Sequence, residues 1–304
     1  ADKRYYMVLG NHLPSGNFRT TYRFNGDTGS NYALRKSEDG NAENVKINQA
    51  LLEIGNKDEA TQYFDVSYLS NLSANEKLMI NHNMRGNSTG ASNAPSRVEA
   101  YSKWVNTSSV INRIDAFNDQ GGDYAIGSEI VVLGWDPADT HTSNFWEELA
   151  SVELGATADN IDSGTITAKK YLWVQCYINT DGTDLNQAIQ FNGDTGNNYA
   201  RRTSGAGGAD SLSTSAPSIY GAATGAADNK FVNVFIINNS ANEKLVIRHD
   251  LDADTTGSGT APQRAETVGK WDNTSSQITS IKFMDLNPGS NYDTGSIIKV
   301  WGSD

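Results

Sequence analysis

Apolar and polar residues alternate in short stretches along the chain, most clearly near the end of each half. The stretches "SEIVVLG" (128–134) and "SIIKVWG" (296–302) share one spacing. One face of the pair carries the apolar residues Ile130, Val132, Ile298 and Val300. The opposite face carries Val131 in the first stretch and Lys299 in the second. A period of two that tolerates a charge on one face predicts half-buried β-strands.

Other stretches extend this pattern to the whole chain. "EKLMI" (76–80) and "EKLVI" (243–247) alternate in the same way, so we expect Lys77 and Lys244 to point to solvent. The residues expected to point inward are Leu78, Ile80, Leu245 and Ile247. "FVNVFII" (231–237) is almost continuously apolar, which is typical of a central strand. Short strands separated by Asn-Gly, Asp-Thr-Gly and Gly-Gly turns predict an all-β fold of antiparallel β-sandwich, jelly-roll-like domains.

The chain contains an internal duplication. At a shift of 167 residues the matching pairs are "FNGDTGSNYALR" (24–35) with "FNGDTGNNYARR" (191–202), "SANEKLMINH" (73–82) with "SANEKLVIRH" (240–249), and "KWVNTSS" (103–109) with "KWDNTSS" (270–276). We extend the alignment to the first residue by pairing 1–9 with 168–176. Repetition on this scale indicates two copies of one domain. We therefore expect a first domain at 1–134, a linker at 135–145 and a second domain at 146–304.

One segment of the second domain has no counterpart in the first. Residues 146–167, "WEELASVELGATADNIDSGTIT", are expected to form two strands around a polar turn. The first domain either closes its sheet without them, or lost an upstream segment, or receives the strands from another chain. An uncovered strand edge favours aggregation, so we expect something to cover it. Ala1 fits both the removal of an initiator Met and a proteolytic cut.

Charge and composition exclude several classes of partner. The formal net charge of the 304 residues is −12, which repels phosphate backbones and anionic lipid, so we expect neither a nucleic acid nor a membrane partner. No apolar run approaches the roughly 18 residues of a membrane span. Cys176 is the one cysteine, so no intramolecular disulfide can form, and its apolar surroundings predict a buried side chain.

The two Asp-Thr-Gly sequences raise the question of catalysis. Asp27 and Asp194 each stand in a pattern that resembles the paired signature of pepsin-like proteases. Such enzymes need two carboxylates that share a proton. Here glycine precedes each aspartate, the apolar lead-in is missing, and the repeated sequence continues far beyond the aspartates. We therefore interpret both as structural turns in which the carboxylate accepts backbone N–H groups and the glycines take positive φ angles. No catalytic residue is assigned.

A metal site has one weak candidate. In "DLDADTTG" (250–257) the aspartates Asp250, Asp252 and Asp254 occupy alternate positions before a glycine, as in a calcium loop. The twelfth position is Ala261, where a calcium loop has an acidic residue. We interpret the segment as an acidic loop, with calcium as the alternative, and expect no other cofactor.

Three aromatic residues are candidates for stacking on a sugar ring. Trp104 and Trp271 precede "NTSS" in the two copies, and Tyr220 lies near an expected loop. A tryptophan repeated in this way more often suits the end of a β-sandwich, with its N–H bonded to the backbone. Both interpretations stay open, and we place the two tryptophans with Asp27 and Asp194 among the structural repeat positions.

The composite pattern "FNGDTG.NYA.R … N.SANEKL.I.H … KW.NTSS.I..I … DTGSIIKVWG" resembles a group of tailed-bacteriophage virion structural proteins from marine and environmental phages. The resemblance covers nearly the whole chain. Members usually carry a segment like 146–167 before each copy, and residues 1–134 are expected to lack it.

This resemblance implies a non-enzymatic particle component. We expect a capsid decoration (cement) or fibre protein that forms a homo-oligomer and binds other capsid, tail or fibre proteins. It would be made in the host cytoplasm and exposed on the virion surface. The alternative is a carbohydrate- or receptor-binding module of a phage fibre that recognises a host surface glycan.

Overall fold

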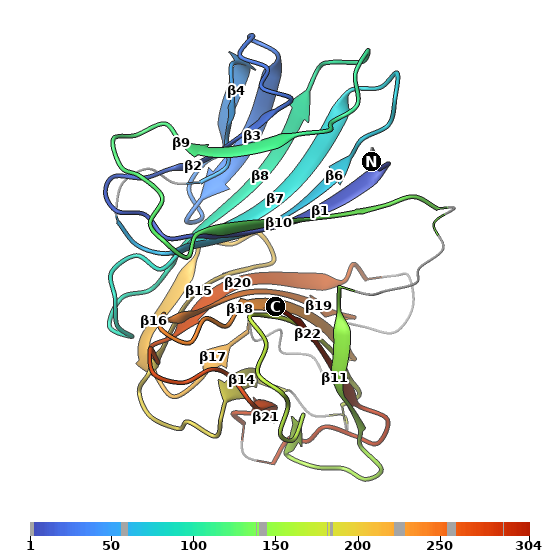
Figure 1. Cartoon of the computed structure of the whole chain (residues 1–304). Helices are drawn as coiled ribbons and strands as arrows, with labels where there is room; N and C mark the ends of the chain where they lie inside the picture. Colours follow the sequence, from blue (N-terminus) through green and yellow to red (C-terminus); the bar gives the residue numbers. More distant parts are fainter. Residues whose placement is uncertain are drawn as a thin grey trace. The chain divides into compact units, whose positions relative to one another are not determined.

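The chain is built from β-strands. A computed structural model describes residues 3–55, 60–137, 139, 145–180, 182, 185–221, 229–253, 260–287 and 289–304. Within these ranges the regular secondary structure consists of β-strands alone. All pairings between these strands are antiparallel (Figure 1). By contacts between Cα atoms the chain divides into two compact units, Ala1–Asn87 with Ser96–Ser143, and Ser88–Pro95 with Asn144–Asp304.

The first domain is a sandwich of two sheets. The larger sheet has the order β10 (Glu129–Trp135), β1 (Tyr5–His12), β6 (Tyr63–Ser70), β7 (Lys77–Arg85), β8 (Ser96–Trp104), β3 (Tyr32–Glu38) and β4 (Asn44–Gln49). The smaller sheet has the order β5 (Leu52–Glu53), β2 (Thr20–Phe24) and β9 (Ile114–Asn118). Inward residues of both sheets, including Val8, Tyr22, Tyr32 and Trp104, form one buried core. Burial of apolar surface between the sheets is the main force that holds them together.

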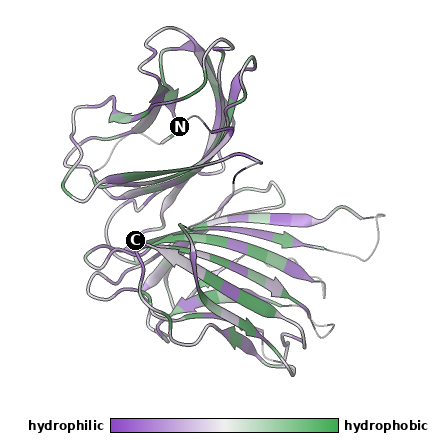
Figure 2. Ribbon diagram, turned by 45° about the vertical axis from the view of Figure 1, so that its right-hand side comes forward, coloured by the Kyte–Doolittle hydropathy of each residue, from purple (hydrophilic) through white to green (hydrophobic). Residues whose placement is uncertain are grey.

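The second domain repeats this plan with one more strand in each sheet. The larger sheet has the order β11 (Glu147–Glu153), β22 (Ile297–Ser303), β13 (Tyr171–Ile178), β18 (Lys230–Ile237), β19 (Lys244–Asp252), β20 (Gln263–Trp271), β15 (Tyr199–Gly205) and β16 (Ser211–Ala216). The smaller sheet has the order β12 (Asn160–Asp162), β21 (Ile281–Asp285), β14 (Gln187–Phe191) and β17 (Ile219–Tyr220). Figure 2 shows hydrophobic and hydrophilic residues alternating along the strands of its larger sheet, as expected for strands with one face in the core.

The first strands of the two domains align one residue away from the expected position. Tyr5 of β1 pairs with Ser70, and Tyr171 of β13 pairs with Ile237. Since Ser70 and Ile237 are equivalent residues, Tyr5 corresponds to Tyr171, and the expected pairing of 1–9 with 168–176 is wrong by one residue. The correction matters because a slip of one residue exchanges the two faces of a strand.

The lysines of the "SANEK" segment point inward, contrary to the expectation. Lys77 and Lys244 are buried, and Met79 lies in the first core on the same face as Lys77. The ammonium of Lys77 donates to the carbonyls of Asn75 and Asn106 at 2.6 and 3.0 Å. These carbonyls compensate for its loss of water.

The neighbouring aliphatic residues accordingly lie on the outer face. Leu78 and Ile80, expected inside, are 56% and 44% exposed. In the second domain Leu245 and Ile247 are buried, but they lie outside the core cluster to which Val246 belongs. Periodicity therefore identified both strands but not which face of each meets the core.

Candidate functional site

The Asp-Thr-Gly segments begin with a tight turn between β2 and β3. Asn25 and Gly26 have φ angles of 52° and 68°, and the N–H of Asp27 donates to the carbonyl of Phe24 at 2.9 Å. Two consecutive positive φ angles define a type I′ turn, for which Asn-Gly is the favoured sequence. Asn192 and Gly193 repeat the turn, with φ angles of 53° and 66°. The expectation for the glycines therefore holds for Gly26 and Gly193.

The second glycine of the motif has a different role. Gly29 does not have a positive φ angle, but an added Cβ would lie 2.7 Å from the Asn31 side-chain nitrogen. Gly196 stands in the same relation to Asn198. A larger residue at either position would have to displace the asparagine side chain, which its hydrogen bond to the aspartate holds in place.

The Asp27 carboxylate is held by three donors from its own domain. Its Oδ1 accepts the backbone N–H of Gly29 at 2.8 Å, and its Oδ2 accepts the Nδ2 of Asn31 at 2.9 Å and the Nε1 of Trp104 at 2.7 Å. The hydroxyl of Tyr32 accepts the N–H of Phe24 at 2.9 Å. The carboxylate thus joins the turn to the end of β8.

Asp194 repeats this geometry. It accepts from the backbone N–H of Gly196 at 2.8 Å, from the Nδ2 of Asn198 at 3.0 Å and from the Nε1 of Trp271 at 2.7 Å. Burial alone would raise the pKa of both carboxyls, but these hydrogen bonds outweigh it and hold each pKa below its ordinary value. A proton-sharing pair would instead hold one of the two carboxyls protonated. The geometry therefore fits two separate structural turns.

The two candidate sugar-stacking tryptophans are core residues. Trp104 and Trp271 are each 1% exposed, and Tyr32 and Tyr199 stack on them with ring centroids 6.4 and 6.3 Å apart. A buried indole ring cannot present a face to a sugar, so the stacking assignment for the tryptophans is wrong. The expected core position is confirmed, but each N–H donates to an aspartate carboxylate and not to the backbone as expected.

Tyr220 is partly exposed on β17 but already engaged. Its hydroxyl donates to the Oδ1 of Asn186 at 2.9 Å, and the guanidinium of Arg201 lies 4.9 Å from its ring centroid. The structure does not bring Tyr220 together with either tryptophan in one stacking site.

The calcium candidate is a strand rather than an open loop. Asp250 and Asp252 lie in β19 and are buried. Arg248 donates to both carboxylate oxygens of Asp250 at 2.6–3.0 Å, and Lys230 forms an ion pair with Asp252. Asp254 lies outside the described residues. Among the residues whose structure is described, no group of three or more His, Cys, Asp or Glu side chains is placed to hold a metal ion.

A buried polar network in the first domain was not recognised from the sequence. Asp65 is fully buried, and its Oδ1 lies 2.7 Å from the Nε2 of His12. The hydroxyl of Tyr22 donates to Oδ2 at 2.9 Å, and Ser67 and Asn81 donate to the same oxygen at 3.3 Å. The network saturates a carboxylate that would be very costly to bury alone.

The second domain shows that the scaffold does not require this network. Ile178 takes the place of His12, and Val232 the place of Asp65. Both replacements are buried in the second core. A sequence signal existed, because at the aligned positions one copy has a charged or polar residue where the other has an aliphatic one. It was hidden at His12 by the slip of one residue in the alignment of the first strand.

The cysteine of the second domain lies in the same core. Cys176 in β13 is fully buried, as expected, and burial raises the pKa of its thiol. A thiol held in its neutral form is a poor nucleophile. Cys176 therefore acts as a small apolar core residue.

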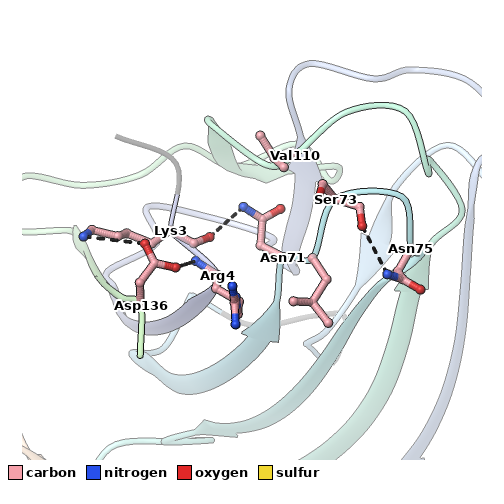
Figure 3. Close-up of a pocket in the computed structure, with 8 residues that line it drawn as sticks. Lys3, Arg4, Asn71, Ser73, Asn75, Val110 and Asp136 are labelled. Carbon is pink, nitrogen blue, oxygen red and sulfur yellow. Dashed lines mark hydrogen bonds and ion pairs between the residues drawn. The ribbon is translucent and has the colours of Figure 1, made fainter. Parts of the chain in front are cut away.

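A pocket of about 250 Å³ lies at the beginning of β1. It is lined by Lys3, Arg4, Asn71, Leu72, Ser73, Asn75, Val110 and Asp136. Figure 3 shows Asp136 beside Lys3 and Arg4, with Asn71 opposite them. The carboxylate of Asp136 accepts the backbone N–H of Arg4 at 2.9 Å, and Asn71 donates to the carbonyl of Lys3 at 2.9 Å. The first bond ties the beginning of β1 to the end of β10, and the second ties it to the end of β6.

The same tie recurs in the second domain. Asp304 accepts the backbone N–H of Lys170 at 3.1 Å, and Asn238 donates to the carbonyl of Lys169 at 2.9 Å. The Nζ of Lys169 donates to Asp304 at 3.0 Å. Repetition of the tie in both copies favours a structural role for the groups around the pocket.

Comparisons with known proteins name no family. No protein-family model matches the chain, and no curated protein matches it. Among solved structures, the mouse laminin alpha1 chain, domains LG4-5, is similar at 12% sequence identity, over 98% of this chain and 82% of that one, with a TM-score of 0.21. A score this low carries no argument, so the architecture described above rests on the strand order. A search of the described residues for membrane-spanning helices found none.

Proposed function

We propose that the chain is a non-enzymatic structural protein of a tailed-phage particle, exposed on the virion and acting by binding other virion proteins. The supporting observation is the use made of the repeated residues. Asp27 and Asp194 each hold a turn and a tryptophan of their own domain. The motif that most resembles a catalytic signature thus serves the scaffold twice. This agrees with the resemblance of the composite pattern to phage structural proteins.

The duplicated architecture suits a role on a symmetric particle. Two linked copies of one domain can bind two equivalent sites, and the second binding event then benefits from a high effective concentration. The net charge of −12 keeps such a protein soluble and away from the packaged genome.

The test is the protein's presence and copy number on purified particles. Antibodies raised against the purified chain should label intact particles in electron microscopy. Quantitative mass spectrometry should find many copies per particle, with a number that fits the particle's symmetry. The proposal fails if the protein accumulates in infected cells but is absent from purified particles.

A carbohydrate-binding module remains the second candidate because aromatic residues gather on one sheet face. Trp173 and Trp301 are direct cross-strand neighbours on the face of β13 and β22 opposite the core, with ring centroids 4.8 Å apart. Trp146 lies 5.8 Å from Trp173, and the buried Phe235 stacks on Trp173 at 5.9 Å and supports it from the same face. Partly exposed aromatic rings can stack on sugar faces.

A glycan array with the purified chain distinguishes this second candidate. Saturable binding that is lost in Trp301→Ala but kept in Tyr101→Ala, a variant at an exposed aromatic residue of the first domain, would support it. If both variants and the unmodified chain bind equally, Trp301 takes no part in glycan binding. The observation that favours the second candidate then fails.

A further inference from the structure

The two domains differ at the edge of each sheet. In the second domain β11 pairs with β22 from Glu147↔Gly302 to Glu153↔Ile297, and β12 pairs with β21. These two strands belong to residues 146–167, the segment without a counterpart in the first domain. Their side chains complete the second core: Ile161 is 1% exposed, and Leu149 and Val152 pack against the core cluster.

In the first domain both sheets stop at the edges to which these two strands would add. In the sheet orders β10 and β9 are edge strands, whereas their counterparts β22 and β21 each have a further neighbour. In Figure 1 β11, in light green, lies beside β22, in dark red, while β10 forms the margin of the first domain's larger sheet beside β1. Among the described residues no further strand adds to β10 or to β9.

The missing strands leave apolar side chains uncovered. Val132 of β10 is 44% exposed, whereas the equivalent Val300 of β22 is fully buried. Ile130 is partly exposed, and the equivalent Ile298 is fully buried. On β9 the same contrast holds for Ile114, which is partly exposed, and Ile281, which is fully buried. The second domain therefore shows both what covers these positions and how completely they become buried.

We propose that the open edge of the first domain, formed by β9 and β10, binds a strand-turn-strand segment of a separate polypeptide chain with the chemistry of residues 146–167. One strand of this segment would add to β10 and place small aliphatic residues over Ile130 and Val132, as Ala150 and Val152 do beside Val300 and Ile298. The other would add to β9 and cover Ala116, as Ile161 covers Phe283. Backbone pairing supplies affinity, and the alternate aliphatic side chains supply specificity.

Residues 146–167 of a second copy are not the donor. They are the one such segment within residues 1–304, and the second domain uses them for β11 and β12. An exchange between copies would therefore uncover one edge of a second domain for each first-domain edge, which we also call the groove, that it covered. This inference rests on the proposed function, since it specifies how the chain binds another virion protein.

The probe is a synthetic peptide of residues 146–167, titrated into the full chain. We expect one peptide to bind per chain, with slowed amide hydrogen exchange in β10 and β9. Binding that protects β22 and β21 instead, or no saturable binding up to millimolar concentration, overturns the proposal. A peptide with Val152→Asp and Ile161→Asp should bind at least tenfold more weakly, and equal binding also overturns it.

Two matched variants of the chain test the location. Val132→Asp places a charge on the exposed edge of β10, and Ile47→Asp places one on the exposed edge strand β4 of the same sheet. Val132→Asp should weaken peptide binding at least tenfold, while Ile47→Asp should leave it unchanged; equal effects contradict the assignment. Analytical ultracentrifugation of the chain alone tests the donor. A change of oligomeric state in Val132→Asp but not in Ile47→Asp would show that a second copy fills the groove, against the proposal.

This experiment is independent of the test of the proposed function. Peptide binding is measured on the purified chain without particles. Absence of the protein from particles would refute the virion role and leave the groove intact, whereas failure of the peptide would refute the groove and leave the virion role standing.

Discussion

The indole N–H of Trp104 donates to the carboxylate of Asp27 at 2.7 Å, and Trp271 donates to Asp194 at the same distance. Each contact joins a turn at the beginning of a domain to a strand that comes much later. The aspartates therefore stabilise the contact between these two segments, and the loss of this stabilisation can be measured.

Replacing Asp27 or Asp194 by asparagine should destabilise the domain that contains it. The amide has one acceptor oxygen, so the carboxylate's charge-assisted bonds to Trp104 or Trp271 are weakened. We expect a loss of about 1–2 kcal/mol for each substitution in urea unfolding followed by tryptophan fluorescence. Asp123→Asn, at an exposed aspartate, is the control and should change little. A peptidase activity that disappeared in the double variant would contradict the structural role.

The same aspartates should make stability depend on acid pH. Their folded-state pKa values lie below the ordinary value, because the hydrogen bonds favour the charged form. The resulting stabilisation is fully present above the unfolded-state pKa of about 3.9 and is lost as the pH falls through the folded-state pKa. We expect the melting temperature to fall more steeply below about pH 4 in the unmodified chain than in the Asp27→Asn, Asp194→Asn double variant. Identical slopes would exclude the aspartates as the cause.

Lys244 should also make stability rise with pH, but in the alkaline range. Burial lowers the pKa of its ammonium to about 8. Between pH 8 and the ordinary pKa of about 10.4 the unfolded chain binds a proton that the folded chain does not, so stability from this group rises with pH. Lys244→Met should remove that rise, which denaturant unfolding at pH 7.5 and 9.5 can measure. An unchanged rise in Lys244→Met would assign it to another group.

The polar network around Asp65 predicts a strong coupling between residues. Tyr22→Phe should cost about 1–2 kcal/mol in the unmodified chain, because it removes one of the hydrogen bonds to a buried carboxylate. In an Asp65→Val background the same substitution should cost far less, because the hydroxyl has already lost its acceptor. A double-mutant cycle in urea measures the difference, and additive effects would show that the two side chains do not interact.

Much of the fold could be predicted from alternation and repetition. The paired stretches 128–134 and 296–302 correspond to β10 and β22, and the continuous apolar run 231–237 lies in the central strand β18. These predictions succeeded because apolar periodicity reflects burial directly. The structural interpretation of the Asp-Thr-Gly turns also agrees with the geometry, because Asn-Gly is a local signal with a known turn type.

What failed depends on contacts between distant segments. The orientation of Lys77 is decided by carbonyls on two loops, which its own strand does not reveal. The His12–Asp65 pair joins residues on two strands, and neither residue is unusual alone. The repetition of Trp104 favours a core position over a sugar-binding platform, but the sequence does not show that its partner is Asp27. Sequence patterns give the period of a strand, but tertiary packing chooses the inward face.

The turn at Phe24–Asp27 has a consequence for the order of folding. Its closing hydrogen bond from Trp104 spans 77 residues, so the complete clasp cannot exist before β3, β7 and β8 have come together. Contacts of such long range form at the cost of chain entropy and come after the local ones. The bonds from Trp104 and Trp271 therefore close each Asp-Thr-Gly turn after distant strands of its domain have assembled, and each half of the chain has its own such bond.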